Sequence, residues 1–418
     1  MSSILTSKHI LLGVTGSIAA YKAAELASRL TQEGAQVDVI LTPAAERFVA
    51  PLTYQSVTGR RAFTEAELWD GEAHVLHVGL GHSADLLVIA PCTANTIARL
   101  AHGSADNLLT ITALAARCPI LLAPAMDVGM FAHPATQENV RILNERGVHF
   151  AGPGEGRMAS GLTGKGRMLE PAELLGHIRL VLGKNGKLAG KKVVVTAGGT
   201  QEAIDPVRVI TNRSSGKQGY ALAQAAIDAG AQVTLITAPT SLTAPVGARL
   251  IEVRTAGEML EAVLAESVRR VGAAHSTYSA GVDALLMAAA VADFRPKKVA
   301  EDKLKKRDGI PQVELEAAPD ILETVAGLGS GEKRPRVVVG FAAESRDLLE
   351  NAAAKLSSKK LDMIVANDIS ASDSGFAVDT NRVTLLFADA REESLPLMGK
   401  AEVAEAIIER VAAMLETE

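Results

Sequence analysis

The sequence has little cysteine, few aromatic residues and no long apolar run. Only two of its 418 residues are cysteines, Cys92 and Cys118, and no CxxC motif is present, which excludes a disulfide framework. Aromatic residues make up 3%, which argues against a surface that stacks bases. The formal net charge of −5 argues against general nucleic-acid binding. No apolar run approaches the roughly 18–20 residues of a membrane span.

The beginning of the chain, MSSILTSKH, lacks the charged and apolar regions of a signal peptide. Together with the scarcity of cysteine, this predicts a protein of the reducing cytoplasm. We therefore expect no nucleic-acid partner and no membrane partner.

Apolar runs alternate with helix-period segments almost throughout, which is typical of an α/β fold with a parallel sheet. Two similar strand–turn–helix openings, one in each half, predict two Rossmann-like domains. The predicted strands are residues 10–14, 37–41, 86–90, 120–123, 192–196, 232–237, 284–289, 337–341 and 362–365.

A polar, glycine-rich stretch, GKNGKLAG at residues 183–190, follows a helix-like segment and predicts a linker. It would separate a domain at 1–182 from a domain at 191–418. Two other segments resemble flaps: the glycine-rich 152–167 and the charge-dense 297–310.

The first half places small polar residues after three predicted strands. Gly16 and Ser17 form a strand-to-helix turn whose N–H groups suit a phosphate, although any such turn favours glycine. Thr42 ends the next strand, and APCTANTIARLA follows the third. Since ligands of open sheets bind at these carboxyl ends, the three segments together predict a ligand site.

The second half contains TAGGT, DPVR and TNRSSGKQG in order, within an unusually long polar loop. Backbone N–H groups of the glycine turn and of the next helix start could surround a phosphate of a small acid. The candidate residues are Gly199, Thr200, Ser214, Ser215 and Gly216.

The motifs GSIAAYK, APCTANTIA, PAMDVGM and HPATQENV resemble those of flavoprotein cysteine decarboxylases. With the second-half motifs, the chain resembles the bifunctional phosphopantothenoylcysteine decarboxylase/phosphopantothenate–cysteine ligase family of coenzyme A biosynthesis over nearly its whole length. The resemblance implies a flavodoxin-like flavoprotein domain followed by a doubly wound nucleotide-binding domain. Its activities would be CTP-dependent ligation of L-cysteine to 4'-phosphopantothenate, then FMN-dependent decarboxylation to 4'-phosphopantetheine. It implies that FMN is bound by Gly16, Ser17, Ile18, Thr42, Thr93, Ala94, Asn95 and Thr96.

For the decarboxylase, the resemblance implies that His77 acts as a base or orienter at the substrate thiol, whereas His74 and His82 are surface residues. The family usually has Asn at Asp127, which contacts the substrate carboxylate, and many members have Cys at Ser160 as the acid. We hypothesise that Asp127 is protonated in the complex, its pKa raised by the like charge and by burial. A serine hydroxyl is a far weaker acid than a thiol, so Ser160 is a weak candidate for that step.

For the ligase, the resemblance implies that Asn212 stabilises an acyl-cytidylate and that Lys303 neutralises the triphosphate, with Lys305 and Lys306 as possible helpers. Magnesium is implied with CTP, and the sequence shows no metal-ligand cluster of its own. The implied CTP contacts are Met287, Ala288, Ala289, Asp293, Lys303, Ala318, Pro319, Asp320, Ile321, Phe341, Lys355 and Lys359, the last two spaced i, i+4 on one helix face.

The family further implies homo-oligomers, with flavin-domain trimers and ligase-domain dimers. Three alternatives stay open at this point: an active ligase with an impaired flavin half, a flavin-binding regulatory subunit, and a two-domain NAD dehydrogenase. The last lacks support because neither glycine turn is followed by GxGxxG.

Overall fold

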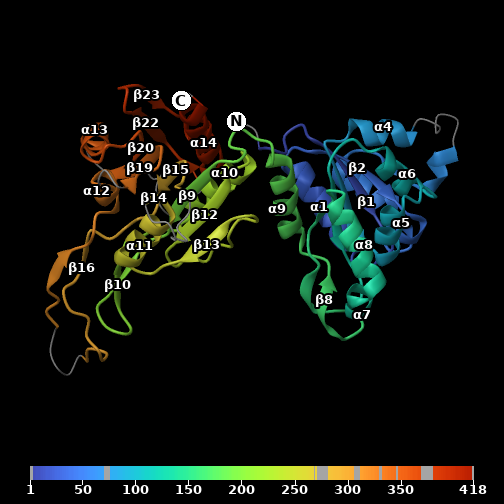
Figure 1. Cartoon of the computed structure of the whole chain (residues 1–418), viewed down its shortest axis with the longest axis horizontal. Helices are drawn as coiled ribbons and strands as arrows, with labels where there is room; N and C mark the ends of the chain where they lie inside the picture. Colours follow the sequence, from blue (N-terminus) through green and yellow to red (C-terminus); the bar gives the residue numbers. More distant parts are fainter. Residues whose placement is uncertain are drawn as a thin grey trace. The chain divides into compact units, whose positions relative to one another are not determined.

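The computed structural model divides into two compact units, Ser2–Gly183 and Lys184–Glu418 (Figure 1). The division falls at the start of the predicted 183–190 linker, whose exact extent stays a prediction. Two residues named above, His74 and Lys306, lie outside the described residues. The structure describes residues 3–69, 76–267, 269–270, 281–305, 311–328, 332–344, 347–368 and 380–416.

The first unit alternates strands and helices along the chain. In order, its elements are β1 (His9–Val14), α1 (Ala20–Gln32), β2 (Gln36–Leu41), α2 (Pro43–Glu46), α3 (Pro51–Thr58), β3 (Ala62–Phe63), η1 (Glu65–Trp69), α4 (Leu76–Ser83), β4 (Leu86–Cys92), α5 (Ala94–His102), α6 (Leu108–Ala115), β5 (Ile120–Pro124), α7 (Val128–Ala132), α8 (Pro134–Glu145), β6 (His149–Phe150), β7 (Gly154–Arg157), β8 (Thr163–Arg167) and α9 (Pro171–Gly183).

The main sheet of this unit has the order β3-β2-β1-β4-β5-β6, and all its pairings are parallel. Without the two-residue edge strand β3, the remaining order is that of flavodoxin-like sheets. The chain reverses direction across the sheet between β1 and β4. The predicted parallel α/β fold is confirmed, and this switch point is where such sheets bind ligands.

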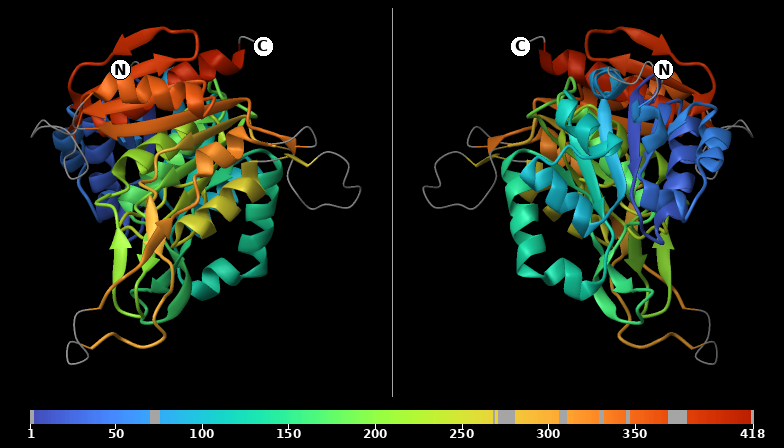
Figure 2. Two further views of the ribbon diagram at one scale, coloured as in Figure 1. Left: turned by 90° about the vertical axis from the view of Figure 1, so that its left-hand side faces the viewer. Right: turned by 90° about the vertical axis from the view of Figure 1, so that its right-hand side faces the viewer.

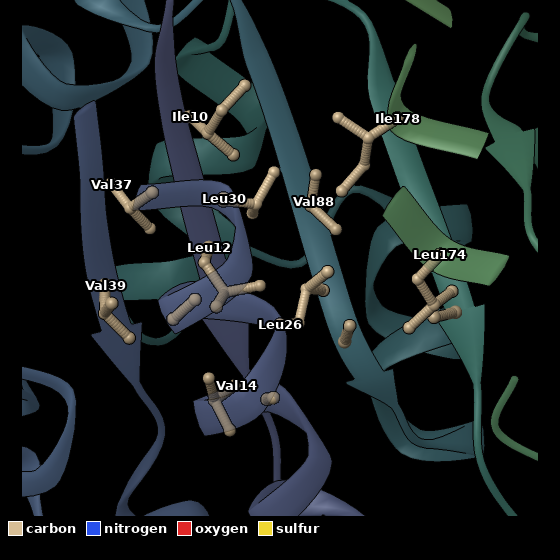
Figure 3. Packing of buried hydrophobic residues seen from close by; sticks show 14 of the residues in the cluster. Ile10, Leu12, Val14, Leu26, Leu30, Val37, Val39, Val88, Leu174 and Ile178 are labelled. Atoms are coloured by element: carbon tan, nitrogen blue, oxygen red, sulfur yellow. The ribbon is translucent and has the colours of Figure 1, made fainter. Parts of the chain in front are cut away.

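Helices cover both faces of the sheet because the central strands are apolar on both sides. One face packs against α1, α3 and α9, as Figure 3 shows for Leu26, Leu30, Leu174 and Ile178 above Leu12 and its neighbours. The other face packs against α4, α5, α6 and α8. These two apolar layers hold the strand ends, and therefore the site at the switch point, in a fixed arrangement.

The second unit repeats this alternation and adds antiparallel hairpins. In order, its elements are β9 (Lys192–Ala197), β10 (Gln201–Ala203), β11 (Val209–Thr211), α10 (Lys217–Asp228), β12 (Gln232–Thr237), β13 (Arg249–Glu252), α11 (Ala256–Ser267), β14 (Arg269–Arg270), β15 (Ala284–Met287), β16 (Phe294–Pro296), β17 (Leu315–Ala317), α12 (Ile321–Ala326), β18 (Glu332–Lys333), β19 (Val337–Glu344), α13 (Leu348–Ser358), β20 (Met363–Asp368), β21 (Thr380–Asn381), β22 (Val383–Phe387), β23 (Glu392–Ser394), β24 (Met398–Gly399) and α14 (Lys400–Glu416).

Its main sheet has the order β13-β12-β9-β15-β19-β20-β22-β23, parallel as far as β20 and antiparallel beyond it. Helices α11, α12 and α13 supply apolar residues to one face, whereas α10 and α14 pack against each other on the other. The predicted doubly wound domain is confirmed, with its switch point between β9 and β15.

Two antiparallel pairs project from this sheet and lie side by side (Figures 1 and 2): β10 with β11, and β16 with β17. The first pair is the long polar loop identified in the sequence. The second brackets part of the charge-dense segment 297–310. Both pairs therefore start from the strand ends that form the switch point.

The start of β1 carries a partly buried ion cluster. His9 Nε2 lies 2.7 Å from Asp38 Oδ2, and His9 Nδ1 lies 3.0 Å from the Ser83 carbonyl. Because both ring nitrogens face acceptors, the imidazolium is favoured, and the hydrogen bond to Asp38 raises the pKa of His9 despite burial. Arg60 binds the same carboxylate.

We expect thermal stability to depend on the protonation of His9. A raised pKa in the folded state stabilises the fold fully below the ordinary value of 6.5, and this contribution is lost as the pH rises through the folded pKa. Melting temperatures are measured at pH 6 and at pH 8.5. Over this range the wild type should lose on the order of 2–4 °C more than a His9→Asn variant loses. An exposed-histidine control, His102→Asn, should follow the wild type; parallel curves for wild type and His9→Asn would contradict the prediction.

Candidate functional site

The second unit contains a cavity of ≈ 720 Å³ at the carboxyl ends of the parallel strands. It brings together segments that are far apart in the sequence: the end of the long loop, the turn after β15, the start of α12, and α13. The predicted ligase residues that line it are Asn212, Ser214, Ser215, Gly216, Met287, Ala288, Ala289, Asp293, Ala318, Pro319, Asp320, Ile321, Phe341, Lys355 and Lys359.

Small residues form the wall after β15. The Thr196 hydroxyl accepts a hydrogen bond from the Ala289 N–H at 3.1 Å, and the Asp293 carbonyl accepts one from the Ala318 N–H at 2.9 Å. The hydrogen bond to Thr196 holds the turn after β15 against β9. The hydrogen bond to the Asp293 carbonyl joins the same turn to the segment before α12. The Asp293 side chain stays exposed and available to a ligand.

Lys355 and Lys359 both line the cavity, but Lys359 is the C-cap of α13 and is already paired. Its Nζ lies 2.8 Å from Asp320 Oδ2 and 3.0 Å from Glu323 Oε2. The hydrogen bond to Asp320 raises the pKa of Lys359. A polyphosphate would therefore have to displace two carboxylates from Lys359, a competition that the i, i+4 spacing alone does not reveal.

Asn212 connects two walls of the cavity, because its Nδ2 donates to the Val291 carbonyl at 2.9 Å. The neighbouring Gly216 has a φ of 75° and caps α10 without a side-chain hydrogen bond. Gly219 allows α10 to approach β9, since a Cβ there would lie 2.6 Å from the Ala197 Cβ. Glycines thus bring the helix start against the strand end.

Gly199 and Thr200, which are predicted to contact the substrate phosphate, are not among the residues that line the cavity. Thr200 is 0% exposed, and its Oγ1 accepts from the Ala292 N–H at 2.9 Å. Its own N–H donates to the Ala290 carbonyl at 3.3 Å. In this structure the polar groups of Thr200 join the glycine turn to the segment after β15, and its contact with the substrate phosphate stays a prediction.

Lys303 lies on the segment beyond β16 and is exposed. It is not among the residues that line the cavity, unlike the other predicted CTP contacts. Lys305 is exposed on the same segment.

The first unit gathers hydroxyl side chains at the carboxyl ends of β1, β2 and β4. The buried Thr15 Oγ1 donates to the Pro91 carbonyl at 2.7 Å and accepts from the Thr93 N–H at 3.2 Å. Thr93 and Thr42 are the N-caps of α5 and α2. Gly16 is required here, because a Cβ would lie 2.5 Å from the Ala44 Cβ. The sequence reasoning missed Thr15, which joins the two strands of the switch point.

The other residues predicted to bind flavin belong to the same turns. Ser17 is half-buried and Ile18 is 63% exposed, both just before α1. Ala94 and Asn95 begin α5, with Asn95 exposed, whereas Thr96 is buried and its hydroxyl lies 3.1 Å from the Thr93 hydroxyl. Thr96 therefore supports the turn from inside it.

His77 lies on α4, and its Nδ1 is buried without a hydrogen-bond partner among the described residues. A buried polar atom without a partner costs stability. Such an atom in a predicted site is consistent with a partner that comes from a bound molecule. His82, on the same helix, is exposed, as predicted for a surface residue.

Asp127 and Ser160, the two departures from the family pattern, are in direct contact. Ser160 Oγ donates to Asp127 Oδ2 at 2.6 Å, and the Gly129 N–H donates to Asp127 Oδ1 at 3.0 Å. The hydrogen bond from Ser160, followed by that from Gly129, lowers the pKa of Asp127. Asp127 is half-buried and its carboxylate is hydrogen-bonded, so the net effect of its surroundings here is a lower pKa; the protonation hypothesised for the substrate complex stays a prediction.

Comparison with known proteins identifies both halves. Residues 2–183 match the family described as Flavoprotein, and residues 188–415 match the DNA/pantothenate metabolism flavoprotein C-terminal domain. The chain is 45% identical over 414 residues to the coenzyme A biosynthesis bifunctional protein CoaBC of Bacillus subtilis (strain 168), with 98% of each chain covered. The chain belongs to the CoaBC family.

A second curated relative agrees with this assignment. The chain is 44% identical over 409 residues to the CoaBC protein of Vibrio parahaemolyticus, which covers 97% of this chain and 98% of the relative. A crystal structure of a CoaBC C-terminal domain is 38% identical, covers 56% of this chain and 100% of that one, and has a TM-score of 0.45. This CoaBC-family chain is thus a bifunctional ligase and decarboxylase of coenzyme A biosynthesis.

Six polar residues of the ligase cavity were not predicted: Lys217, Gln218, Glu323, Asn367, Asn381 and Lys400. Asn381 Nδ2 donates to Gln218 Oε1 at 3.1 Å, which joins the start of α10 to β21. The Oδ1 of Asn367 is buried and has no hydrogen-bond partner among the described residues. A possible sequence signal for Asn367 is its place at the end of an apolar strand, where ligands of parallel sheets bind.

Two further properties bear on partners. In the described part of this CoaBC-family chain, no helix combines the length and apolar character that a membrane crossing requires. No group of three His, Cys, Asp or Glu side chains within the described ranges could hold a metal ion.

Proposed function

We propose that the cavity of the second unit binds CTP and 4'-phosphopantothenate together. The single observation that supports this most strongly is the meeting of the Met287–Asp293 segment, the start of α12 and the Asn212–Gly216 segment around one space. In the reaction, the substrate carboxylate attacks the α-phosphorus and pyrophosphate leaves. The cysteine amine then attacks the acyl carbon, and CMP leaves.

In this proposal the wall after β15 holds the base. Its small residues allow close approach, and the exposed Asp293 carboxylate accepts from the exocyclic amino group of cytosine. Phe341 lines the same space. Lys355 and Lys359 face the phosphates, with Lys359 exchanging its carboxylate partners for phosphate oxygens. Magnesium is proposed only as an ion that comes with the nucleotide.

Asn212 and Lys303 are proposed to act on the reacting groups, and the start of α10 is proposed to hold the substrate phosphate. The Asn212 amide stabilises the acyl-cytidylate by hydrogen bonding, and as an amide it cannot attack that intermediate. Ser214, Ser215 and Gly216 offer donors to the substrate phosphate at the start of α10. Lys303 neutralises the triphosphate charge as pyrophosphate leaves, and would have to reach the cavity from its exposed segment.

We propose that the first unit binds FMN at the switch point of its sheet. Gly16, Ser17, Ile18, Thr42, Thr93, Ala94, Asn95 and Thr96 belong to the turns that would hold it, and the unpartnered Nδ1 of His77 is consistent with a bound molecule there. When bound, FMN supplies the redox chemistry that turns the cysteine side chain into an electron sink for decarboxylation. His77 orients the substrate thiol and accepts its proton.

The β7–β8 hairpin is proposed to cover the decarboxylase site and exclude water. It is seated on the body of the unit, since the Met126 N–H donates to the Gly166 carbonyl at 3.0 Å. Ser160 follows β7 and reaches Asp127 from this hairpin. Because its proton points to a carboxylate, Ser160 is poorly placed as an acid, which favours another acid or water for the final protonation.

We further propose homo-oligomers in the cytoplasm, with trimers of the first unit and dimers of the second. Exposed apolar side chains support self-association in each unit. They include Ile18, Tyr21, Phe48 and Leu52 in the first, and Val207, Val209, Phe294, Val313 and Leu315 on the paired hairpins of the second.

A coupled assay tests the proposed function. Purified protein with CTP, 4'-phosphopantothenate and cysteine should release pyrophosphate and CO2, and ATP should replace CTP poorly. Pyrophosphate without CO2, even from supplied phosphopantothenoylcysteine, would establish the alternative of an active ligase with an impaired flavin half. The contact of Ser160 with Asp127 is the observation that favours this alternative.

We expect Asp127→Asn to preserve decarboxylation and to lower the KM for phosphopantothenoylcysteine several-fold at pH 7. Hydrogen bonds keep Asp127 ionised, so its charge opposes the substrate carboxylate, whereas Asn keeps an acceptor for the Gly129 N–H. Steady-state CO2 release measures both parameters. Loss of turnover in Asp127→Asn would show that the carboxylate itself is needed.

A further inference from the structure

Asp205 is a buried carboxylate in the loop between β10 and β11. Its side chain is 0% exposed. Its Oδ1 accepts hydrogen bonds from the Val207 and Arg208 N–H groups, both at 2.8 Å. This oxygen therefore closes the loop on itself, as aspartate commonly does in a turn.

The other oxygen of Asp205 leaves the hairpin and reaches the segment that carries Lys303. Oδ2 accepts from the Leu304 N–H at 3.2 Å, and Arg208 Nη2 donates to the Leu304 carbonyl at 2.9 Å. The Ala300 N–H donates to the Ile204 carbonyl at 3.0 Å. The peptide groups on both sides of Leu304 are thus held by hydrogen bonds. These contacts also fix the backbone of Lys303, which precedes Leu304.

We propose that Asp205 is a positioning residue of the ligase reaction, which fixes Lys303 by anchoring the Leu304 peptide to the β10–β11 hairpin. The inference rests on the role proposed above for Lys303. An exposed lysine on a charge-dense segment loses side-chain and backbone freedom when it acts on a phosphate. Anchoring the adjacent peptide in advance reduces that loss, which is how a residue without substrate contact contributes to rate.

The electrostatics of Asp205 agree with an anchor. Burial alone would raise the pKa of this carboxyl, but the hydrogen bonds from Val207, Arg208 and Leu304 outweigh it and lower the pKa. Arg208 Nη1 lies 3.5 Å from Oδ2 and adds a favourable charge. The group is therefore ionised at neutral pH, and charged acceptors form the stronger hydrogen bonds.

The test is Asp205→Asn, with Glu301→Gln as the matched control. Asparagine keeps one oxygen, which can accept from the Val207 and Arg208 N–H groups. Its NH2 group replaces the other oxygen and is a donor, so it cannot accept from the Leu304 N–H or the Arg208 guanidinium. Glu301 is an exposed acid on the same segment, so its amide variant removes the same charge without an anchor. We expect trypsin to cut after Lys303 at least about fivefold faster in Asp205→Asn, because cleavage requires a released peptide. Glu301→Gln should match the wild type.

Activity supplies the second readout. Pyrophosphate release by Asp205→Asn should fall about tenfold in kcat, with decarboxylation of supplied phosphopantothenoylcysteine unchanged. In a Lys303→Ala background, Asp205→Asn should cause no further loss. Losses that multiply in the double variant, or unchanged trypsin cleavage, overturn the positioning role.

Failure of the underlying function is distinguishable from failure of this inference. If Lys303→Ala alone retains full pyrophosphate release, the assignment of Lys303 is wrong, and the positioning role falls with it. If Asp205→Asn does not accumulate as folded protein, Arg208→Lys replaces it, because that change removes the contact to the Leu304 carbonyl. Arg208→Lys should also speed cleavage after Lys303, and unchanged cleavage overturns the proposal.

Discussion

Asn212→Asp is expected to reduce pyrophosphate release at least about 100-fold, because it removes a donor beside the reacting groups. The substitution changes the side chain little in size. However, it places a carboxylate oxygen against the Val291 carbonyl, where the Asn212 Nδ2 now donates at 2.9 Å. It also places a negative charge in a cavity proposed to hold a triphosphate. The loss should therefore appear in kcat as well as in the KM for CTP, and decarboxylation of supplied phosphopantothenoylcysteine should stay unchanged.

The matched control for this prediction is Asn144→Asp. Asn144 is an exposed residue of α8 in the first unit, so the variant adds the same charge away from the ligase cavity. Its rate of pyrophosphate release should equal that of the wild type. A quench of the Asn212→Asp reaction before cysteine is added would show whether the acyl-cytidylate forms. Wild-type rates for Asn212→Asp would remove Asn212 from the proposed mechanism.

The sequence was sufficient to predict the central strands of the two main sheets, but not β3, β6, β13, β22 and β23, which lie toward the sheet edges. The run 232–237 coincides with β12, and the run 192–196 falls one residue short of β9. Both are apolar runs bounded by glycine or polar turns, so local signals decide them. The added hairpins β10–β11 and β16–β17 were only recognised as a polar loop and a charged segment, because their apolar side chains are exposed rather than patterned on a core.

The candidate site was predicted less completely, because pairing depends on tertiary contacts. Spacing placed Lys355 and Lys359 near one another but could not show that Asp320 and Glu323 already bind Lys359. Similarly, a TAGGT turn does not reveal that Thr200 is completely buried. The contact between Asp127 and Ser160 joins residues 33 positions apart, and no local pattern encodes it.

His77→Asn is expected to reduce decarboxylation at least about 100-fold, the usual cost of losing a positioned acid–base group. The variant should leave pyrophosphate release unchanged, since the ligase cavity lies in the other unit. His82→Asn is the matched control, because His82 is exposed on the same helix. Unlike His82, His77 has a buried Nδ1 that lacks a hydrogen-bond partner among the described residues.

The melting temperature of His77→Asn provides a second readout. Asparagine places an amide atom near the position of the His77 Nδ1, so the buried polar atom is kept and His77→Asn should unfold at about the same temperature as the wild type. A residue retained for packing would instead lose stability and activity together. The informative outcome is therefore a large loss of CO2 release, measured with supplied phosphopantothenoylcysteine, at an undiminished melting temperature. Full decarboxylation by His77→Asn would exclude His77 as the proton acceptor and leave its buried nitrogen as a structural feature of α4.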